Sequence, residues 1–401
     1  MFESVTRLPD DAILGLIQQV GADPNPKKAA LGVGVYRDET GVTPILDVVK
    51  EAERLLLQTE NTKAYIGSHG DPKFARHIPA LLLGKTSPVV AEQRVSATET
   101  PGGCGALRLG ADLIAGEAKQ KPTRIWVPQP TWPNHVRLFS AAGLQVEHYP
   151  YVDKNNRLDF DAMMSGLRRV PAGDVVLFHA CCHNPTGFDP GVGQWKQILE
   201  VVRERNLFPF VDFAYQGFGE GLEEDAFAVR LLAENVSEML IAQSCSKNFG
   251  IYRERTGTLL AIAPDAEQTV NVRSHIGVTA RGSYSHPPTH GGAVVDTILS
   301  SPELTARWRE EVDGMRARIH TMRNKLADGL AARGLGERFD FLKTQRGMFS
   351  YTGLSKAQVG KLKDKYSVYM VDSGRMSVPG LNQKNVDYVC EAIAEVVKAD
   401  A

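Results

Sequence analysis

The feature that most constrains the fold is a regular alternation of two kinds of segment through the middle of the chain. Short apolar runs, each typical of a buried strand, alternate with stretches whose apolar residues recur every three or four positions, as on one face of a helix. This alternation predicts an α/β domain with a mostly parallel central sheet covered by helices. The runs are RIWVPQP (124–130), QVEHYPYV (145–152), DVVLFHACC (174–182), LFPFVDFAY (207–215), EMLIAQSCS (238–246) and TGTLLAIA (256–263), with helical patterns at 105–118 and 192–206 among others.

The pattern changes near Ser301. A long charged helical stretch at 303–334 is followed by short strands around 339–354 and 366–371, and a helix at 385–399 closes the chain. We therefore predict a large domain of residues 45–310 and a smaller α+β domain. The smaller domain combines 311–401 with 1–44, which includes an N-terminal arm.

Composition narrows the class of partner. The 401 residues include 46 basic and 47 acidic side chains, a balance that favours small-molecule substrates over nucleic acid or an anionic membrane surface. No signal-peptide features stand at the amino terminus and no apolar stretch is long enough to span a bilayer, so we expect a cytoplasmic protein. Five scattered cysteines argue for a reducing compartment. Adjacent Cys181 and Cys182 lack the spacing of a zinc ligand pair, so no metal is expected.

One short segment carries most of the chemistry. In SCSKNFGIYRER (244–255), Lys247 lies near Ser244 and Ser246, with Arg255 eight residues further on. A lysine amine can form a Schiff base with the aldehyde of pyridoxal 5'-phosphate, and hydroxyls with a guanidinium suit its phosphate. A solvated lysine in an ordinary turn has the same local sequence. The interpretation as a cofactor site depends on the motifs that accompany it.

Two of those motifs can be interpreted from their residues alone. Asp212 ends an apolar strand, where a buried carboxylate needs a partner, and a protonated pyridine nitrogen would provide one. A helix N-cap is the alternative role for this residue. In TETPGGCGALRLG, Gly102, Gly103 and Cys104 precede a helical run, so backbone amides and the helix dipole can meet a phosphate. The loop lacks the context of a dinucleotide fingerprint.

Taken together, the motifs resemble those of class I aminotransferases, in the aspartate/aromatic amino-acid aminotransferase family. The resemblance extends over essentially the whole chain and implies a pyridoxal-phosphate-dependent homodimer of fold type I, with two active sites shared between subunits. Thr256 departs from the family pattern, where an aliphatic residue is usual. The motifs are LGVGVYRDETG, YIGSHGD, TPGGCGALR, TWPNH, HNPTG, DFAYQGF, SKNFG, YSHPP and SGR.

The resemblance also implies roles for single residues. Lys247, Asp212, Tyr215 and Trp132 would be catalytic, with Trp132 stacked on the cofactor ring and His135 orienting Asp212. Tyr215 and Asn184 would hold the cofactor's phenolic oxygen. The phosphate would be bound by Gly102, Gly103, Cys104, Ser244, Ser246 and Arg255, together with Tyr65 of the neighbouring subunit. The substrate would be bound by Gly34, Trp132, Asn184, Arg375 (α-carboxylate) and, from the neighbouring subunit, Arg281 (side-chain carboxylate).

The implied reaction is a two-stage amino transfer from an amino acid to 2-oxoglutarate, in which Lys247 moves a proton. Ala64, Cys104 and His286 stand where aspartate-restricted relatives have Asn, Thr and Asn, whereas Val35, Arg37 and Thr43 resemble the aspartate type. We predict activity on phenylalanine, tyrosine, tryptophan and aspartate. Restriction to dicarboxylates is the alternative.

Two rival functions explain the sequence less well. A β-lyase or decarboxylase on the same fold would leave Arg281 without a role. A non-catalytic binding protein that had borrowed the fold would be expected to lose Lys247, which is present here.

Overall fold

The computed structural model describes residues 2–7, 12–117 and 123–400. The chain divides into two compact units. One unit is Pro44–Ala317, and the other combines the two ends of the chain, Met1–Thr43 and Arg318–Ala401. The assignment of residues 45–310 to a cofactor-binding domain stays a prediction, so each unit is described by itself.

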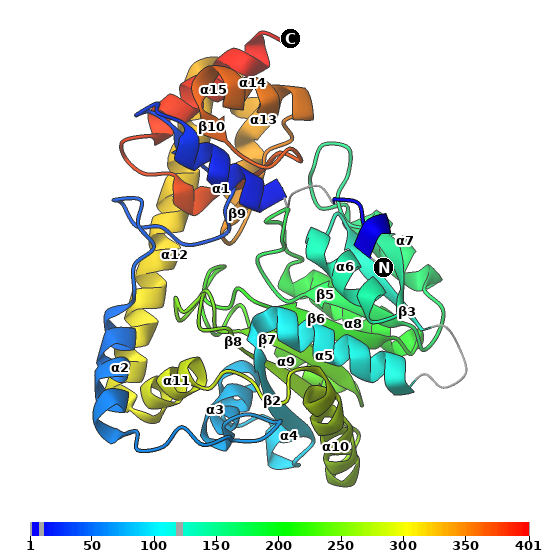
Figure 1. The fold of residues 1–401 in the computed structure, drawn as a ribbon. Helices are drawn as coiled ribbons and strands as arrows, with labels where there is room; N and C mark the ends of the chain where they lie inside the picture. Colours follow the sequence, from blue (N-terminus) through cyan, green and yellow to red (C-terminus); the bar gives the residue numbers. More distant parts are fainter. Residues whose placement is uncertain (1, 8–11, 118–122, 401) are drawn as a thin grey trace. The chain divides into compact units, whose positions relative to one another are not determined.

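In the described part of unit 44–317, seven strands form one sheet in the order β2-β8-β7-β6-β5-β3-β4 (Figure 1). Strands β4, β3, β5, β6 and β7 run parallel to one another, whereas β8 is antiparallel to both β7 and β2. The predicted mostly parallel α/β sheet is confirmed. The strands are β2 (Val95–Pro101), β3 (Arg124–Gln129), β4 (Gln145–Pro150), β5 (Val175–His179), β6 (Phe208–Phe213), β7 (Met239–Ser244) and β8 (Thr256–Ile262).

Burial explains which strands the sequence could reveal. Every residue of β5, β7 and β8 is buried, because helices cover both faces of the sheet and its central strands are mostly apolar. Strand β2 was not predicted. Its sequence VSATETP carries hydroxyls and a glutamate, although its five central residues are buried as well.

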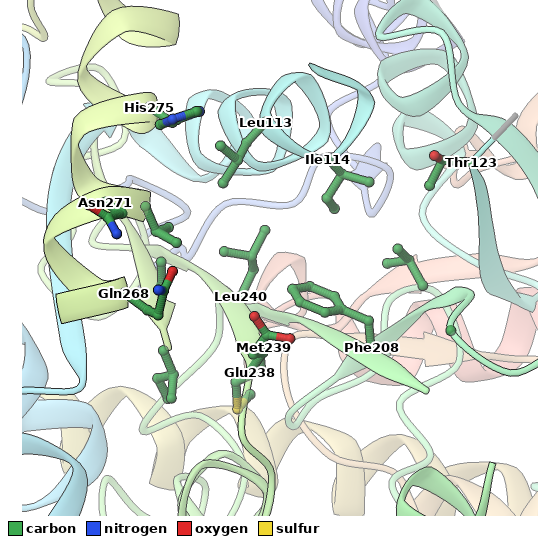
Figure 2. Close-up of a pocket in the computed structure, with 15 residues that line it drawn as sticks. Leu113, Ile114, Thr123, Phe208, Glu238, Met239, Leu240, Gln268, Asn271 and His275 are labelled. Atoms are coloured by element: carbon green, nitrogen blue, oxygen red, sulfur yellow. The ribbon is translucent and has the colours of Figure 1, made fainter. Parts of the chain in front are cut away.

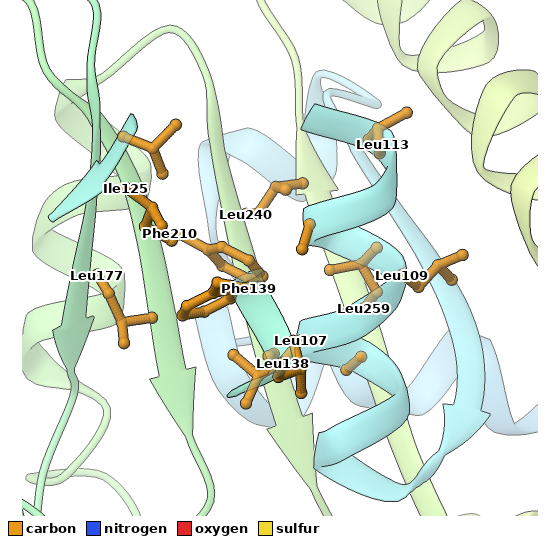
Figure 3. Packing of buried hydrophobic residues seen from close by; sticks show 14 of the residues in the cluster. Leu107, Leu109, Leu113, Ile125, Leu138, Phe139, Leu177, Phe210, Leu240 and Leu259 are labelled. Carbon is orange, nitrogen blue, oxygen red and sulfur yellow. The ribbon is translucent and has the colours of Figure 1, made fainter. Parts of the chain in front are cut away.

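The main core lies between helix α5 (Gly102–Glu117) and the sheet (Figure 3). Leu107 and Leu113 of α5 pack with Phe210 and Leu240 of the strands, and all four side chains are buried. The helix approaches the sheet closely at Gly110, where a Cβ atom would lie 2.6 Å from Cζ of Phe210. A glycine is therefore needed there to let the helix reach this depth.

The remaining helices of this unit flank the sheet or follow it in the chain. Helix α12 (Pro302–Leu330) contains the division between the two units and ends before Gly334, whose φ of 79° is incompatible with a continuing helix. The others are α2 (Asp47–Thr59), α3 (Pro72–Leu83), α4 (Pro88–Ala91), α6 (Pro133–Ala141), α7 (Phe160–Arg169), α8 (Val192–Glu204), α9 (Phe227–Asn235), α10 (Ala266–Ser283) and α11 (His290–Ser300).

The unit made from the chain ends has two small sheets in its described part. Strand β1 (Ala29–Ala30) pairs parallel with β10 (Val368–Tyr369), and β9 (Phe349–Tyr351) pairs antiparallel with β11 (Arg375–Ser377). The short strands predicted around 339–354 are only partly confirmed, because 340–344 forms a 3₁₀-helix. The helical segments are η1 (Phe2–Ser4), α1 (Ala12–Ala22), η2 (Ala331–Leu335), α13 (Gly336–Phe339), η3 (Asp340–Thr344), α14 (Lys356–Tyr366), η4 (Val378–Gly380) and α15 (Val386–Lys398).

No helix of the described residues combines the length and the apolar character that crossing a membrane requires.

Candidate active site

The predicted site residues of unit 44–317 gather at one edge of the sheet. Strands β3, β5, β6 and β7 are parallel, so their carboxyl ends meet at this edge. The antiparallel β8 begins there, directly after Arg255, and β2 ends there, directly before Gly102. Ligands of open α/β sheets bind at the carboxyl ends of the strands, so the topology favours a site here.

Lys247 lies in a turn that follows β7. The turn is held by Trp308, whose indole Nε1 donates to the carbonyl of Asn248 at 2.8 Å and whose ring stacks on Phe249 with centroids 4.4 Å apart. The Lys247 ammonium nitrogen lies 4.6 Å from the ring centroid of Tyr215. Anchoring by a buried tryptophan fixes the backbone from which the lysine side chain extends.

The environment lowers the pKa of Lys247. Burial is the main cause, and the positive charge of Arg255 adds to it, while Asp212 and Cys104 act in the opposite direction. A lower pKa increases the fraction of neutral amine, which is the form that attacks carbonyl groups and accepts protons.

Asp212 stands on β6 with its carboxylate hydrogen-bonded to His135. The His135 Nε2–H donates to Oδ2 at 3.0 Å. Burial by itself would raise the pKa of Asp212, but this hydrogen bond and electrostatic interactions with His135, His179 and Lys247 outweigh it and hold the pKa below its ordinary value. The strand therefore presents an ionised carboxylate in a buried position.

Sequence reasoning missed two residues behind His135. The Thr131 hydroxyl lies 2.8 Å from Nδ1 of His135 and 3.2 Å from Nε2 of His179, which links the three side chains in a row leading from Asp212. Burial, followed by the charge of His135, lowers the pKa of His179 to about 3, so its ring is neutral. Thr131 follows one predicted strand and His179 lies within another, but only contact in the fold connects them to Asp212.

Asn184 and Tyr215 lie together as predicted. The Asn184 Nδ2 donates to the Tyr215 hydroxyl at 3.4 Å, and both residues are buried. Trp132 caps the start of α6 and meets His135 edge to face, with centroids 5.2 Å apart and an interplanar angle of 87°. Trp132 also packs against the main core.

The first turn of α5 lies against the residues predicted to bind phosphate. A Cβ atom on Gly102 would be 2.5 Å from Nη2 of Arg255, and one on Gly103 would be 3.1 Å from Cβ of Ser244. The Ser246 N–H donates to the Ser244 hydroxyl at 3.2 Å. Two glycines, a guanidinium and a hydroxyl thus surround a helix N-terminus, which is a suitable donor set for a phosphate dianion.

Cys104 lies in the same turn of α5. Its thiol accepts a weak hydrogen bond from Nδ2 of Asn134 at 3.8 Å. Burial raises the pKa of Cys104, so the group is a neutral thiol and a weak donor.

Tyr65 and Arg281 form a separate group on the surface of the same unit. Tyr65 is 89% exposed and meets the ring of His286 edge to face at 4.9 Å, while Nη1 of Arg281 donates to the hydroxyl of Ser285 at 2.5 Å. Among the described residues, neither makes a hydrogen bond or ring contact with Lys247.

Gly34 and Arg375 belong to the other unit and lie on the same aromatic ring. The Arg375 guanidinium carbon is 4.3 Å from the ring centroid of Phe349, and its Nη2 donates to the carbonyl of Gly32 at 2.9 Å. A Cβ atom on Gly34 would lie 2.8 Å from Cζ of Phe349. This arrangement holds the arginine side chain beside the glycine loop.

Two other features were considered as sites. Cys181, Cys182 and Asp225 bring possible metal-ligating atoms within 4.8 Å of one another. The Asp225 carboxylate, however, already accepts the N–H groups of Gly217, Gly219 and Glu220 at 2.8 to 2.9 Å, and burial keeps the Cys181 thiol protonated by raising its pKa. These groups act as loop anchors and do not provide the charge that a metal ion needs.

The second feature is a cavity of about 540 Å³ at the opposite edge of the sheet (Figure 2). Phe208 and Leu240, near the starts of β6 and β7, line it together with Ile114 of α5. No lysine or cysteine occurs among its described lining residues, so it lacks the nucleophile found near Asp212.

Comparison with known proteins agrees with this geometry. An aromatic-amino-acid aminotransferase of Pseudomonas aeruginosa is 54% identical over 396 residues, covering 98% of each chain. An aspartate aminotransferase of Escherichia coli is 47% identical over 398 residues, covering 99% of this chain and 100% of the relative. The crystal structure of an aromatic-amino-acid aminotransferase from Burkholderia pseudomallei, covalently bound to pyridoxal phosphate, matches with a TM-score of 0.96 and 43% identity over 99% of each chain. The family model for aminotransferase class I and II matches residues 26–393, and the chain belongs to that family.

Proposed function

We propose that this aminotransferase moves the amino group of aromatic amino acids, and of aspartate, to 2-oxoglutarate with pyridoxal 5'-phosphate as cofactor. The observation that carries the proposal is that an amine and a carboxylate are buried near each other. The Lys247 amine, with its lowered pKa, and the ionised Asp212 lie within electrostatic reach of each other beside the phosphate-type donors of α5.

The residues present fit this cofactor. Gly102 and Gly103 leave room where a Cβ would meet Arg255 or Ser244, and the donor set carries positive charge for a phosphate. Asp212, Asn184 and Tyr215 offer a carboxylate and two neutral hydrogen-bonding groups for the ring. When bound, the cofactor supplies a conjugated ring that takes up the electron pair left on the substrate Cα.

Each residue then has a defined task. The Lys247 amine would accept the proton from the substrate Cα and pass it to C4′ of the cofactor, a role for which its lowered pKa is suited. Asp212 holds a proton on the pyridine nitrogen, and His135 keeps Asp212 ionised for this purpose. Asn184 and Tyr215 orient the phenolic oxygen, while Trp132 covers the ring. Ser244, Ser246, Arg255 and the α5 turn, including Cys104, hold the phosphate.

Substrate carboxylates are assigned to two arginines. Arg375 takes the α-carboxylate, beside Gly34, because a guanidinium offers two parallel donors to a carboxylate. Arg281 takes the side-chain carboxylate of a dicarboxylic substrate. The contacts of Arg281 support a loosely held side chain, because its hydrogen-bonded partner among the described residues is Ser285, whereas His286 faces Tyr65 and Pro287.

Loose retention of Arg281 favours broad specificity. An arginine that can swing aside admits an aromatic ring, and relatives of both kinds, aromatic and aspartate aminotransferases, match this chain. Ala64 and His286 stand where aspartate-restricted relatives have asparagines, which would hold Arg281 in a tighter polar network. The backbone N–H of Ala64 donates to the Thr62 hydroxyl.

We also propose a cytoplasmic homodimer. Tyr65 and Arg281 would act in the active site of the second subunit, because among the described residues neither makes a hydrogen bond or ring contact with Lys247. Three strongly exposed apolar side chains accompany them on the segment from α2 to Tyr65 and on α10: Leu57 at 86%, Val270 at 66% and Val278 at 74%. All five cysteines are free thiols, which suits a reducing compartment.

The test is addition of phenylalanine or aspartate alone to the purified protein with bound cofactor. The expected result is a rapid change of the cofactor's absorbance with either donor, together with release of the corresponding 2-oxo acid. A response to aspartate alone would restrict the enzyme to dicarboxylates. Release of ammonia or carbon dioxide without an acceptor would favour a β-lyase or decarboxylase. Lys247→Ala should abolish the response, and Lys50→Ala on the exposed side of α2 is the control.

A further inference from the structure

Glu99, in the middle of β2, is a fully buried carboxyl group that contacts a surface turn. Its Oε2 accepts the N–H of Asp71 at 2.9 Å, and its own N–H donates to the carbonyl of His69 at 3.0 Å. The neighbouring Thr98 hydroxyl lies 3.0 Å from Nδ1 of His69. Two successive residues of β2 therefore hold the turn of residues 69–71 by three hydrogen bonds.

The surrounding backbone is shaped to admit this carboxyl. A Cβ atom on Gly70, whose φ is 77°, would lie 2.4 Å from Oε2, and one on Gly292 of α11 would lie 2.2 Å from Oε1. Oε1 has no hydrogen-bond partner among the described residues. The directly opposite residue on β8, Thr258, likewise has a buried hydroxyl with no partner in the described part of the chain.

The turn that Glu99 holds adjoins Tyr65 and Arg281, the two residues of this chain that are proposed to complete the active site of the second subunit. Tyr65 precedes it by four residues. The His69 ring packs on α10 at Gly277, where a Cβ atom would lie 2.7 Å from Nε2, and Gly277 is one helical turn before Arg281. Figure 1 shows α3 and α10 both beside β2, and Arg273 of α10 donates to the carbonyl of Ala97 at 3.2 Å.

The charge state of Glu99 follows from these surroundings. Burial raises its pKa to about 8, the N–H of Asp71 opposes this, and the Asp71 charge adds to it. Three other titratable groups near Glu99, namely Cys245, Tyr284 and His69, do not change charge near pH 8. Burial raises the pKa of Cys245, after β7, to about 12, and raises the pKa of Tyr284, after α10; burial and then the charge of Arg273 lower the pKa of His69.

We propose that protonated Glu99 is a positioning residue for transamination, which fastens the turn of residues 69–71 to β2 and thereby fixes Tyr65 and Arg281 for the second subunit. An ionised Glu99 would be a buried charge with a single side-chain hydrogen bond, so the site must open to hydrate it. The turn is the smallest element that covers the carboxyl and is the part that opens. The destination of Tyr65 and Arg281 rests on the proposed function, whereas the fastening rests on contacts within one chain.

Hydrogen–deuterium exchange of the holoenzyme tests the fastening, read on peptides that cover residues 64–72 at pH 6.5 and pH 9. After correction for intrinsic exchange, we expect the wild-type segment to be about tenfold less protected at pH 9. In Glu99→Gln the amide carbonyl still accepts the Asp71 N–H but cannot ionise, so protection should be equal at the two pH values. Ser96→Ala, a buried position on the same strand, is the matched control and should behave like the wild type.

A kinetic readout separates positioning from general stability. At pH 9 the KM for 2-oxoglutarate should rise in the wild type relative to Glu99→Gln, with kcat little changed, because Arg281 binds the side-chain carboxylate. The same pH response in wild type and Glu99→Gln overturns the inference. If that variant does not fold, the wild type alone decides, because protection that is independent of pH between 6.5 and 9 also overturns it. Absence of any amino transfer would refute the proposed function and leave the exchange result valid.

Discussion

A single thiol stands among the residues that we propose to bind the cofactor phosphate. Cys104 lies in the first turn of α5, where burial raises its pKa and leaves a neutral S–H, a weaker donor than a hydroxyl. The sequence identified this position because a glycine pair precedes a helical pattern. The structure adds that Asn134 contacts the sulfur at 3.8 Å.

Cys104→Thr should therefore bind the cofactor more tightly. One improved hydrogen bond to a charged group is worth about 1 to 2 kcal/mol, which corresponds to a Kd about five to thirty times lower. Titration of the apoenzyme with pyridoxal phosphate measures this. Cys104→Val, which has a similar shape and no donor, should bind no better than the wild type. Equal affinity of the threonine and valine variants would show that Cys104 does not contact the phosphate.

The titration of Glu99 predicts how stability depends on pH. Its folded pKa of about 8 lies above the ordinary 4.5, so between these values the folded protein holds a proton that the unfolded chain has lost. The stabilisation that this proton adds to the free energy of unfolding is complete below about pH 4.5. It is lost as pH rises towards 8, at about 1.4 kcal/mol per pH unit. Urea unfolding of wild type and Glu99→Gln at several pH values measures the difference. A difference that does not change with pH would contradict the assignment.

At the scale of elements, α5 offers a matched pair of glycines. Gly110 faces Phe210, where an added Cβ would approach to 2.6 Å, whereas at Gly116 an added Cβ would meet nothing within 4 Å. Alanine gains about 1 kcal/mol over glycine within a helix, but overpacking a core costs about 1 to 3 kcal/mol. Gly116→Ala should therefore raise the unfolding midpoint and Gly110→Ala should lower it. If both variants were stabilised, α5 could not be packed as closely as described.

The same elements show why some of the fold could be predicted and some could not. Strands such as β5 and β7 are apolar at nearly every position, so burial on both faces is visible in the sequence. Strand β2 escaped prediction because it is rich in polar residues, and some of these are accommodated by contacts distant in sequence, such as Glu99 with Asp71. The direction of β8 had a usable signal: only 11 residues separate it from β7, too few for a helical crossover to a parallel strand.

The candidate site residues also divide into those that the sequence could predict and those that it could not. Lys247, Asp212 and Asn184 stand in distinctive motifs next to strand ends, and the topology places them at one edge of the sheet. Thr131 is the first residue of the TWPNH motif but was given no role, and His179 lies inside a predicted strand. Their importance comes from a row of hydrogen bonds that only the folded chain reveals.

At the scale of the whole molecule, the assignment of residues to two subunits can be tested by mixing. A chain with Lys247→Ala still carries Tyr65 and Arg281, and a chain with Arg281→Ala still carries Lys247. If the sites are shared, a mixed dimer contains one complete site. Random reassociation of equal amounts should then restore about a quarter of wild-type activity towards aspartate. Each parent variant alone is the control, and no recovery after demonstrated subunit exchange would place Arg281 in its own chain's site.

The unit that contains Arg375 is built from both ends of the chain, with β1 at Ala29–Ala30 paired to β10 at Val368–Tyr369. During synthesis, the amino-terminal strand must wait for its partner while the ribosome adds more than 300 residues, roughly 20 to 70 s at typical translation rates. The sheet beside Lys247 waits less, because its strands all lie between Val95 and Ile262 and its longest gap is between β2 and β8. The nascent chain can therefore complete the sheet that we propose to position the cofactor well before it adds Arg375, to which we assign the substrate α-carboxylate, and the proposed binding of that carboxylate is the last property that the growing chain acquires.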